Sequence, residues 1–409
     1  MIIAYTYYST PWGMSSGDDV RIHNIFKELS TISNKNMVAY VLSHRDRREK
    51  LVVKDGVIYY VLPRRFYNAV SSFLGWKNKN ELNALVKLTN YVDEFLAAAR
   101  ISKAVRPSAR FIYITGSMSL ISWFLKIFGV RKPVMYDPLA NYLQTLYLRS
   151  RNKLIEKIRY SLYAIIHKKQ LNSSDCVVYP SFYDKTNAVR SFRIKRAYEI
   201  PNPYPICYDS VEEAINYRKY HREAKEVPYF ILLSGGKGKG NLEAIKLVLK
   251  VFNSIDPQKF RLIITGPWKD LGRHVKNKSI RLVGYVPQHE LKKLLATSDY
   301  GISPVFSHSA GTFIKILAYM AAGLDIITAP YGIAGLPLDK YKGKVYIARD
   351  PGKFKLIINK IISLWAEKKI RFKERANDFI LCNQIAEEFH SHVEKAISDC
   401  VGASKAKTN

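Results

Sequence analysis

The sequence of 409 residues contains little cysteine, little acidic charge and no long hydrophobic run. Its four cysteines lie far apart and form no CxxC pair; they are Cys176, Cys207, Cys382 and Cys400. This spacing argues against a disulfide framework and against a zinc site, and it is typical of a protein from a reducing compartment. We therefore expect four free thiols and no bound metal.

Segments that address or anchor a protein to a membrane are also missing. The best apolar run, residues 119–130, is interrupted by Lys126 and falls well short of the ~18 residues that a spanning helix needs. The opening residues, MIIAYTYYSTPWG, have no basic region of the kind that begins a secretory signal. The sequence thus predicts a cytoplasmic protein, with any membrane association being peripheral.

Acidic residues are few compared with basic ones. The chain has 65 Lys and Arg against 34 Asp and Glu, which gives a net charge of +31, with +18 in residues 1–200 and +13 in residues 201–409. Such a charge attracts nucleic acid, anionic membranes or phosphorylated substrates. A lysine-rich thermophile surface is the alternative, but there glutamate usually rises together with lysine. No RNP, KH or zinc-finger pattern is present, so we expect no nucleic-acid partner.

Short apolar strands that alternate with helical stretches fill both halves of the sequence. Such alternation predicts an α/β protein with parallel sheets covered on both faces. The strands are expected at residues 2–8, 37–43, 57–63, 111–116, 133–138 and 176–181, and then at 229–234, 260–266, 281–286, 300–305 and 325–330.

A proline-rich segment, EIPNPYP at 199–205, separates the two halves and is expected to act as a hinge. We predict an N-terminal domain at 1–200, a C-terminal domain at 201–380, and a C-terminal helix and tail at 381–409. Each half is long enough to bury a core of its own.

Glycine-rich and cationic loops follow several of these strands. The loop at 234–240 contains Gly235, Gly236, Lys237 and Lys239 and directly follows a strand. Glycine allows the backbone to approach a phosphate closely, and a following helix N-terminus adds its dipole. Ligands of parallel sheets bind beyond the carboxyl ends of the strands, so this loop predicts a phosphate site. A flexible turn without a ligand is the alternative.

Several segments together resemble family 4 glycosyltransferases. The resemblance rests on SGGKGKGNLEAI (234–245), LIITG (262–266), IRLVGYVPQHELKKLLATSDYGISP (280–304), AGTFIKILAYMAAGLDIITAPYGIAGL (310–336), YEIPNP (198–203) and SSDCVVYPSFYDKT (173–186). It implies the GT-B fold, in which two Rossmann-like domains face a central cleft. It also implies a retaining, metal-independent hexosyltransferase that needs no cofactor besides its nucleotide-sugar substrate.

The resemblance also implies roles for individual residues. Lys237 and Lys239 would neutralise the donor diphosphate, and Lys315 would add a further cation. The other donor-binding positions implied are Gly17, Gly235, Gly236, Gly284, Tyr285, Val286, Gly311 and Thr312. Asp137 stands where many family members have a histidine. It is predicted as a catalytic residue beside Lys237 and Lys239, by contact with the acceptor, and a cap on the next turn is the alternative.

Two glutamates common in the family are replaced by Ala310 and Ala318. An alanine cannot accept a hydrogen bond from the donor sugar or the ribose. Two functions follow: a glycosyltransferase with weak donor affinity, or a GT-B-fold binding or scaffold protein without activity.

Basic and aromatic residues alternate at 63–79, where Arg64 and Arg65 precede Phe73 and Trp76. A second basic stretch lies at 147–169. Cations flanking aromatic residues suit the surface of an anionic membrane, so we expect a lipid-linked or other membrane-associated glycan acceptor. Ordinary packing of these segments is the alternative.

Overall fold

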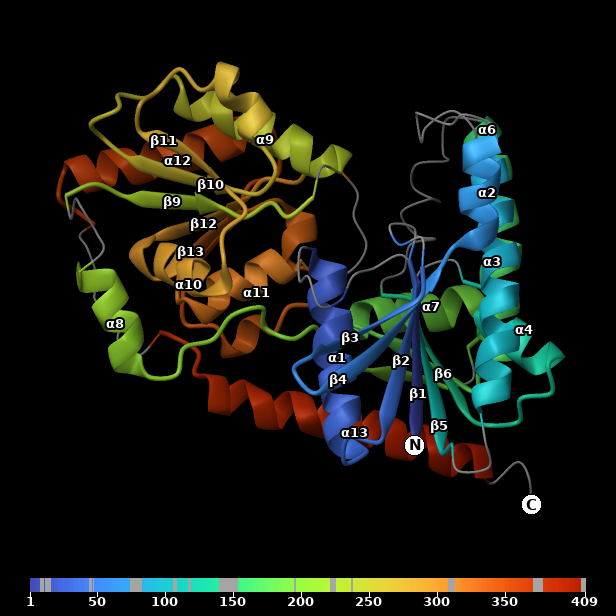
Figure 1. Cartoon of the computed structure of the whole chain (residues 1–409). Coiled ribbons are helices and arrows are strands. Elements are labelled where there is room, and N and C mark those ends of the chain that lie inside the picture. Colours follow the sequence, from blue (N-terminus) through green and yellow to red (C-terminus); the bar gives the residue numbers. More distant parts are fainter. Residues whose placement is uncertain are drawn as a thin grey trace. The chain divides into compact units, whose positions relative to one another are not determined.

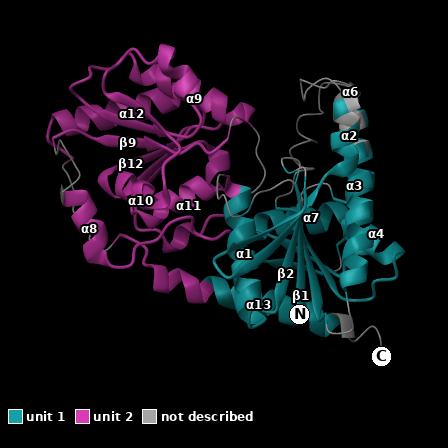
Figure 2. Ribbon diagram, in the orientation of Figure 1, with its two compact units in different colours: residues 1–14, 18–201, 389–409 teal, residues 15–17, 202–388 magenta. Residues whose placement is uncertain are grey.

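The chain divides into two compact units. The computed structural model describes residues 1–7, 11, 16–43, 46, 48–73, 83–105, 109–116, 119–139, 154–194, 196–220, 226–236, 238–307, 313–370 and 378–405. Unit 1 comprises Met1–Met14, Asp18–Pro201 and Phe389–Asn409, and unit 2 comprises Ser15–Gly17 and Asn202–Glu388 (Figures 1 and 2). The main division thus falls at the proline-rich segment, and the end of the chain returns to unit 1.

An eight-stranded sheet forms the centre of unit 1. Its strands lie in the order β3-β4-β2-β1-β5-β6-β7-β8, and every pair is parallel except β3 with β4. β5, β6 and β7 are buried along their whole length, as expected for runs of branched and aromatic residues between two helical layers. The bounds are β1 (Ile2–Tyr7), β2 (Met37–Ser43), β3 (Lys50–Lys54), β4 (Val57–Pro63), β5 (Phe111–Thr115), β6 (Val134–Asp137), β7 (Cys176–Tyr179) and β8 (Ala197–Glu199).

Helices cover both faces of this sheet. The helices are α1 (Gly17–Ile32), α2 (Arg65–Phe73), α3 (Asn83–Ala104), α4 (Ile121–Ile127), α6 (Leu154–Ser173), α7 (Phe182–Phe192) and α13 (Cys382–Lys405). One core contains apolar side chains of α3, α4, α6 and α7, and the other contains those of α1 and α13. The final helix of the chain is therefore part of the first unit's core.

Unit 2 is built around a six-stranded parallel sheet in the order β11-β10-β9-β12-β13-β14. Its strands are β9 (Tyr229–Leu232), β10 (Arg261–Thr265), β11 (Ile280–Gly284), β12 (Tyr300–Ser303), β13 (Asp325–Thr328) and β14 (Val345–Ile347). Its helices are α8 (Val211–Tyr220), α9 (Lys239–Phe252), η2 (Lys269–His274), α10 (Gln288–Thr297), α11 (Ile314–Ala321), η3 (Pro330–Ile333), η4 (Leu338–Lys340) and α12 (Pro351–Ala366). The two sheets confirm the predicted α/β class with two parallel-sheet domains.

Each described cysteine is paired in a disulfide, so the prediction of four free thiols is wrong. Cys176 bonds Cys400 in unit 1, and Cys207 bonds Cys382 in unit 2. The partners are 224 and 175 residues apart in sequence. Helix α13 contributes one cysteine to each disulfide, Cys382 in unit 2 and Cys400 in unit 1. The cysteine spacing therefore gives no support for a reducing compartment.

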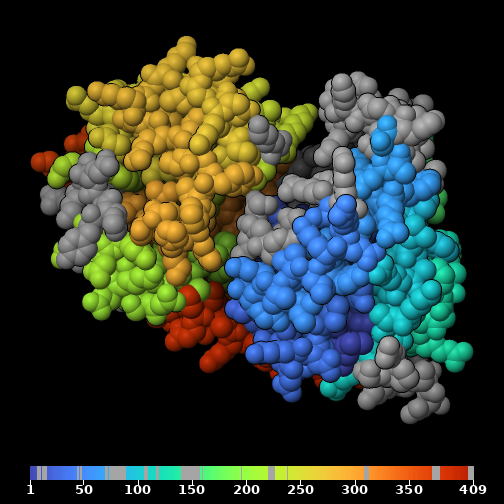
Figure 3. Space-filling model, in the orientation of Figure 1, coloured from blue at the N-terminus to red at the C-terminus, as the bar shows by residue number. Residues whose placement is uncertain are grey.

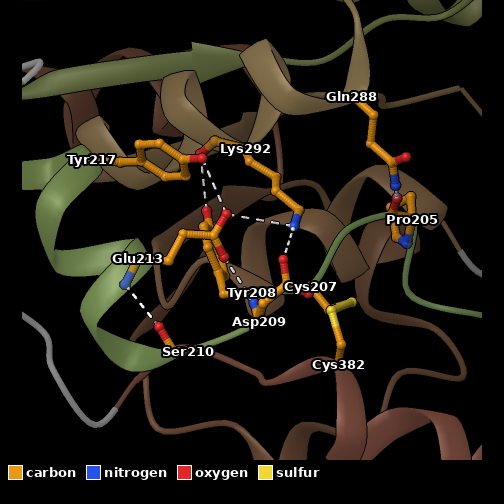
Figure 4. Close-up of polar contacts among 10 residues, drawn as sticks. All are labelled: Pro205, Cys207, Tyr208, Asp209, Ser210, Glu213, Tyr217, Gln288, Lys292 and Cys382. Carbon is orange, nitrogen blue, oxygen red and sulfur yellow. Dashed lines mark hydrogen bonds and ion pairs between the residues drawn. A yellow bond between two sulfur atoms is a disulfide. The ribbon is translucent and has the colours of Figure 1, made fainter.

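The Cys207–Cys382 disulfide lies where the chain enters and leaves unit 2 (Figure 4). Tyr208 accepts a backbone bond from the Cys382 amide and donates its hydroxyl to the Lys292 carbonyl at 3.0 Å. The Lys292 ammonium lies 3.7 Å from the Glu213 carboxylate of α8. These contacts join α8 and α10 to the two segments, around Tyr208 and Cys382, by which the chain enters and leaves unit 2.

Within the described residues, no helix is long and apolar enough to cross a membrane.

Candidate donor site in unit 2

The order of strands in unit 2 marks one place for a ligand. From β9 the chain proceeds outward through β10 and β11, and it then returns to β12 on the other side of β9. Parallel sheets of this type bind ligands where the order reverses, beyond the carboxyl ends of the strands. In unit 2 this place lies between the loop after β9, which contains the glycine-rich segment, and the loop after β12.

Side-chain donors hold three consecutive carbonyls of the glycine-rich loop. Trp268 Nε1 donates to Ser234 O at 3.2 Å, and the Tyr285 hydroxyl donates to Gly235 O at 2.6 Å. Asn241 Nδ2 donates to Gly236 O at 3.0 Å. The donors come from the loops after β10 and β11 and from α9, so the loop has a defined path despite its glycines. The flexible-turn alternative therefore does not describe residues 234–236.

Two glycines permit close packing around this loop. A Cβ on Gly266 would lie 1.7 Å from the Ser234 carbonyl oxygen, and the φ of Gly266 is +104°. A Cβ on Gly240, in the first turn of α9, would lie 2.8 Å from Ser307 Oγ. Gly240 thus brings α9 against the segment that follows β12, which places the two loops of the reversal point side by side.

Tyr319 of α11 joins the two central strands, and no sequence pattern predicts this role. Its hydroxyl accepts a bond from the Leu233 amide at 2.9 Å and donates to the Ile302 carbonyl at 3.1 Å. Burial raises the pKa of Tyr319, so the hydroxyl keeps its proton. Gly301 makes room for the ring, because a Cβ there would lie 2.2 Å from it.

Two serine hydroxyls at the ends of the central strands have no hydrogen-bond partner within the described residues. They belong to Ser234, just after β9, and to Ser303, the last residue of β12, and both side chains are buried. Buried polar groups are normally satisfied, so unpaired ones indicate water or a ligand. Both hydroxyls lie at the point where the strand order reverses.

Lys315 reaches the glycine-rich loop from α11. Its ammonium donates to Asn241 Oδ1 at 2.9 Å, and the same Asn241 side chain holds Gly236 O. Burial lowers the pKa of Lys315 from 10.5 to about 8, since a charged ammonium loses hydration there. A phosphate beside this ammonium would restore the lost stabilisation and raise the pKa again.

Lys239 is the first residue of α9, and its side chain is 84% exposed. Its ammonium lies 3.8 Å from the Glu243 carboxylate one turn later, a weak exposed pairing. The helix is capped by Gly238 with no side-chain bond to its first amides. Amides and dipole at such a helix start attract anions, and Lys239 adds a mobile positive charge beside them.

The structure therefore brings most of the described donor residues to one edge of unit 2. Gly284 ends β11 with a φ of +77°, and Tyr285 and Val286 follow it. Gly235, Gly236, Lys239 and Lys315 lie at the reversal point described above. Within the described residues, no group of three or more His, Cys, Asp or Glu side chains is arranged to hold a metal ion.

The remaining predicted residues fare differently. Lys237, Ala310, Gly311 and Thr312 lie outside the described residues. Gly17 is the first residue of α1 and is grouped with unit 2, where a Cβ on it would lie 3.3 Å from Ile314 Cδ1 at the start of α11. Ala318 is described and is fully buried within the core of unit 2, so a glutamate at this position would have its Cβ among apolar side chains.

Asp137, predicted as a catalytic or capping residue at the end of β6, is fully buried. Its carboxylate lies 2.9 Å from Arg21 Nη2 and accepts hydrogen bonds from the Tyr113 hydroxyl at 2.6 Å and the Leu139 amide at 2.8 Å. Arg21 also donates to the Ile200 carbonyl at 2.8 Å. This geometry supports the capping alternative and gives no support to a catalytic role.

Comparisons with known proteins concern the fold and the second unit. Residues 229–366 match the family model described as glycosyl transferases group 1. No curated protein matches the sequence. Among solved structures, the α,α-trehalose-phosphate synthase (UDP-forming) of Burkholderia xenovorans, solved with glucose-6-phosphate, is similar at 12% identity and a TM-score of 0.65. This match covers 98% of this chain and 100% of that one.

Two further structures are similar over almost their whole length. Sucrose-phosphate synthase from Thermosynechococcus elongatus matches at 11% identity and a TM-score of 0.63, over 100% of this chain and 98% of that one. WaaG, a glycosyltransferase involved in lipopolysaccharide biosynthesis, matches at 13% identity and a TM-score of 0.64, over 98% of this chain and 100% of that one. The chain therefore has the GT-B fold, and residues 229–366 of its second unit match the group 1 glycosyltransferase model.

Proposed function

We propose that this protein is a retaining glycosyltransferase that moves a sugar from a nucleoside-diphosphate donor to a membrane-associated glycan acceptor. One observation carries the proposal. A glycine-rich loop held through its carbonyls at residues 234–236, a helix start without a side-chain cap and a partly desolvated lysine meet at the strand-order reversal of the segment that matches the group 1 glycosyltransferase model.

The proposed reaction breaks the bond between the sugar's anomeric carbon and the donor diphosphate. A new bond forms between that carbon and an acceptor hydroxyl oxygen, on the same face of the sugar, and the hydroxyl proton goes to the departing diphosphate. Negative charge develops on the diphosphate, so positive charge fixed beside it stabilises the transition state most. Lys315, Lys239 and the first amides of α9 supply that charge.

A nucleoside diphosphate suits the site better than an uncharged ligand. Burial lowers the pKa of Lys315 to about 8, and an anion beside the ammonium would stabilise its charged form more than an uncharged ligand would. Tyr285 is 59% exposed and lies beside Gly235, where its ring can contact a base or ribose. The similar synthase of B. xenovorans is named UDP-forming, and we propose a uridine nucleotide for this chain as well.

A second candidate is a binding or scaffold protein that keeps the fold without activity. It is favoured by Ala318, which offers no oxygen to a ribose hydroxyl. The two candidates share nucleotide binding and differ in turnover, so a binding assay does not separate them.

Donor turnover separates these candidates. The purified protein is incubated with radiolabelled UDP-sugars and with a membrane extract as acceptor, in the presence and absence of EDTA. The proposal expects labelled lipid-extractable glycan and released UDP, both unaffected by EDTA. UDP binding without release of UDP from any donor sugar would leave the scaffold candidate in its place.

A further inference from the structure

The outer face of α6 carries an apolar stripe where a surface helix normally presents polar residues. Ile158, Leu162 and Ile165 are 54, 56 and 67% exposed. At 3.6 residues per turn these side chains lie within a sector of about 60°. The opposite side of the helix is buried through His167 and Leu171, so the exposed stripe is separate from the face that packs on unit 1.

Lysines flank this stripe. Lys157 and Lys168 are exposed and lie about a quarter turn to one side of it. Lys169 continues the stripe toward the end of the helix, with its ammonium 5.0 Å from the centre of the Trp123 ring on α4. The stripe is thus accompanied by positive charge, in the half of the chain that carries +18.

Neighbouring helices extend the apolar surface. α4 packs against both α6 and α3, and these helices lie along the same side of the eight-stranded sheet (Figure 1). Ile127 at the end of α4 is 54% exposed, and Leu96 on α3 is 50% exposed. The α3 and α4 segments form part of the outer surface in the space-filling view (Figure 3). Single exposed apolar residues are ordinary, whereas a set across adjoining helices marks an interaction surface.

The sequence predicts a membrane surface at residues 63–79, and the described part of this segment differs from that prediction at Arg64. Arg64 is buried, its guanidinium 3.8 Å from the Asp93 carboxylate and 3.9 Å from the centre of the Tyr67 ring. The prediction that Arg64 faces a membrane is therefore wrong. Arg65 is exposed and pairs with Glu49 at 3.1 Å. Residues 74–82, including Trp76, lie outside the described part of the chain.

We infer that the outer face of α6, together with the exposed Ile127 of α4 and Leu96 of α3, docks this protein on an anionic membrane surface. An interfacial helix combines aliphatic side chains that enter the headgroup boundary with lysines that meet anionic lipids. A protein partner would not require the flanking cations, and RNA would not require the aliphatic stripe. This membrane surface rests on the proposed function, which supplies the membrane-associated acceptor. It identifies the face of the protein that would contact the membrane holding that acceptor.

Vesicle flotation of the full chain tests the inference. Wild-type protein is mixed with phosphatidylcholine vesicles with and without phosphatidylglycerol, at low and high salt. We expect flotation only with phosphatidylglycerol and release as salt rises. Ile158→Ser, Leu162→Ser and Ile165→Ser together should lower the partition coefficient at least about tenfold, because three aliphatic side chains no longer enter the bilayer. Lys157→Gln and Lys168→Gln should each lower it about fivefold at low salt.

A matched control changes a similar surface elsewhere. Leu356 on α12 is 60% exposed between the exposed lysines Lys355 and Lys360. Leu356→Ser with Lys355→Gln and Lys360→Gln should float as the wild type does. Thermal shift by UDP is measured for every variant, so an unfolded variant or a failed nucleotide site is recognised separately.

Three results would overturn the inference. They are absence of wild-type flotation, equal flotation by the triple serine variant, and an equal loss in the α12 control. A change of oligomeric state on sedimentation, with flotation unaffected, would assign the stripe to a second copy of the chain. If flotation is as expected but UDP neither binds nor forms, the membrane face stands and the proposed function fails.

Discussion

Replacement of Lys315 by methionine tests the electrostatic basis of the donor site. Methionine keeps most of the length and apolar stem of lysine while removing its charge and the bond to Asn241. A hydrogen bond to a charged group contributes about 1.5–3 kcal/mol, so Lys315→Met should weaken UDP binding roughly tenfold to 150-fold at about pH 7.

The pH dependence of this effect follows from the pKa of Lys315, about 8 in the free protein. A bound diphosphate raises that pKa. Above pH 8 the Lys315 amine of the free protein is mostly neutral, so it must take up a proton when UDP binds, and this protonation costs free energy. Wild-type affinity should therefore be constant below pH 8 and fall above it, by up to about tenfold per pH unit. Lys315→Arg should bind without this slope, because a guanidinium stays charged. Lys315→Met should lack the slope and bind weakly throughout.

Isothermal calorimetry with UDP between about pH 7 and 9.5 measures these differences above the range in which the terminal phosphate itself titrates, near pH 6. Lys250→Met is the control, since Lys250 is exposed in the last turn of the same helix α9. Equal affinity of wild type and Lys315→Met at pH 7 would show that Lys315 does not bind the diphosphate. A wild-type affinity that stays constant up to pH 9.5 would show the same.

Three further predictions concern the framework around the site. Gly266→Ala should lower the free energy of unfolding by more than about 2 kcal/mol in urea denaturation, because Gly266 has a φ of +104° and the new Cβ would clash with the Ser234 carbonyl. Gly272→Ala is the control and should change the free energy of unfolding little, since no atom lies within 4 Å of the added Cβ. Tyr319→Phe should weaken UDP binding and lower stability by about 1–3 kcal/mol, since the Leu233 amide loses its acceptor; unchanged melting and affinity would contradict this. Asp137→Asn should lower the melting temperature markedly, because breaking a buried pair costs about 3–5 kcal/mol; a stable variant with lost turnover would restore its catalytic assignment.

The architecture of both units follows from local sequence. Strands such as β5, β6 and β7 are continuous apolar runs between helices, and this pattern is typical only of a sheet buried on both faces. The sequence gives no prediction of β3, because Leu51 and Val53 are exposed at the edge of the sheet and a lysine stands at each end of this short strand. Short β8 and β14 owe their pairing to neighbouring strands rather than to their own residues.

The disulfides and the buried ion pairs could not be read from the sequence. Cys176 and Cys400 meet because α13 packs on the first sheet, a contact across 224 residues that no local pattern encodes. The aromatic neighbours of Arg64 in sequence suggest a membrane contact, but in the structure its guanidinium is buried beside the Asp93 carboxylate of α3. In both cases the tertiary partner, rather than composition, decides where the side chain lies.

The candidate site was predictable in part. Glycines and lysines after a strand indicated the phosphate loop, because few other functions need that composition at a strand end. Tyr319 and Trp268, which hold the strand ends and the loop, were missed since an aromatic residue in an apolar helix or a turn is usually part of the core. The family resemblance implies that Lys315 is a donor-binding cation. Its hydrogen bond to Asn241, which connects it to the glycine-rich loop, is seen only in the structure.

A crystal structure of the protein with bound UDP would show whether the donor site lies in unit 2. We expect the diphosphate at the reversal point of the second sheet, within hydrogen-bond distance of the Lys315 ammonium and of the first backbone amides of α9. The nucleoside should lie toward Tyr285, and Lys239 should turn from Glu243 to the phosphate. A nucleotide bound elsewhere, with Lys315 still bonded only to Asn241, would rule out this donor site.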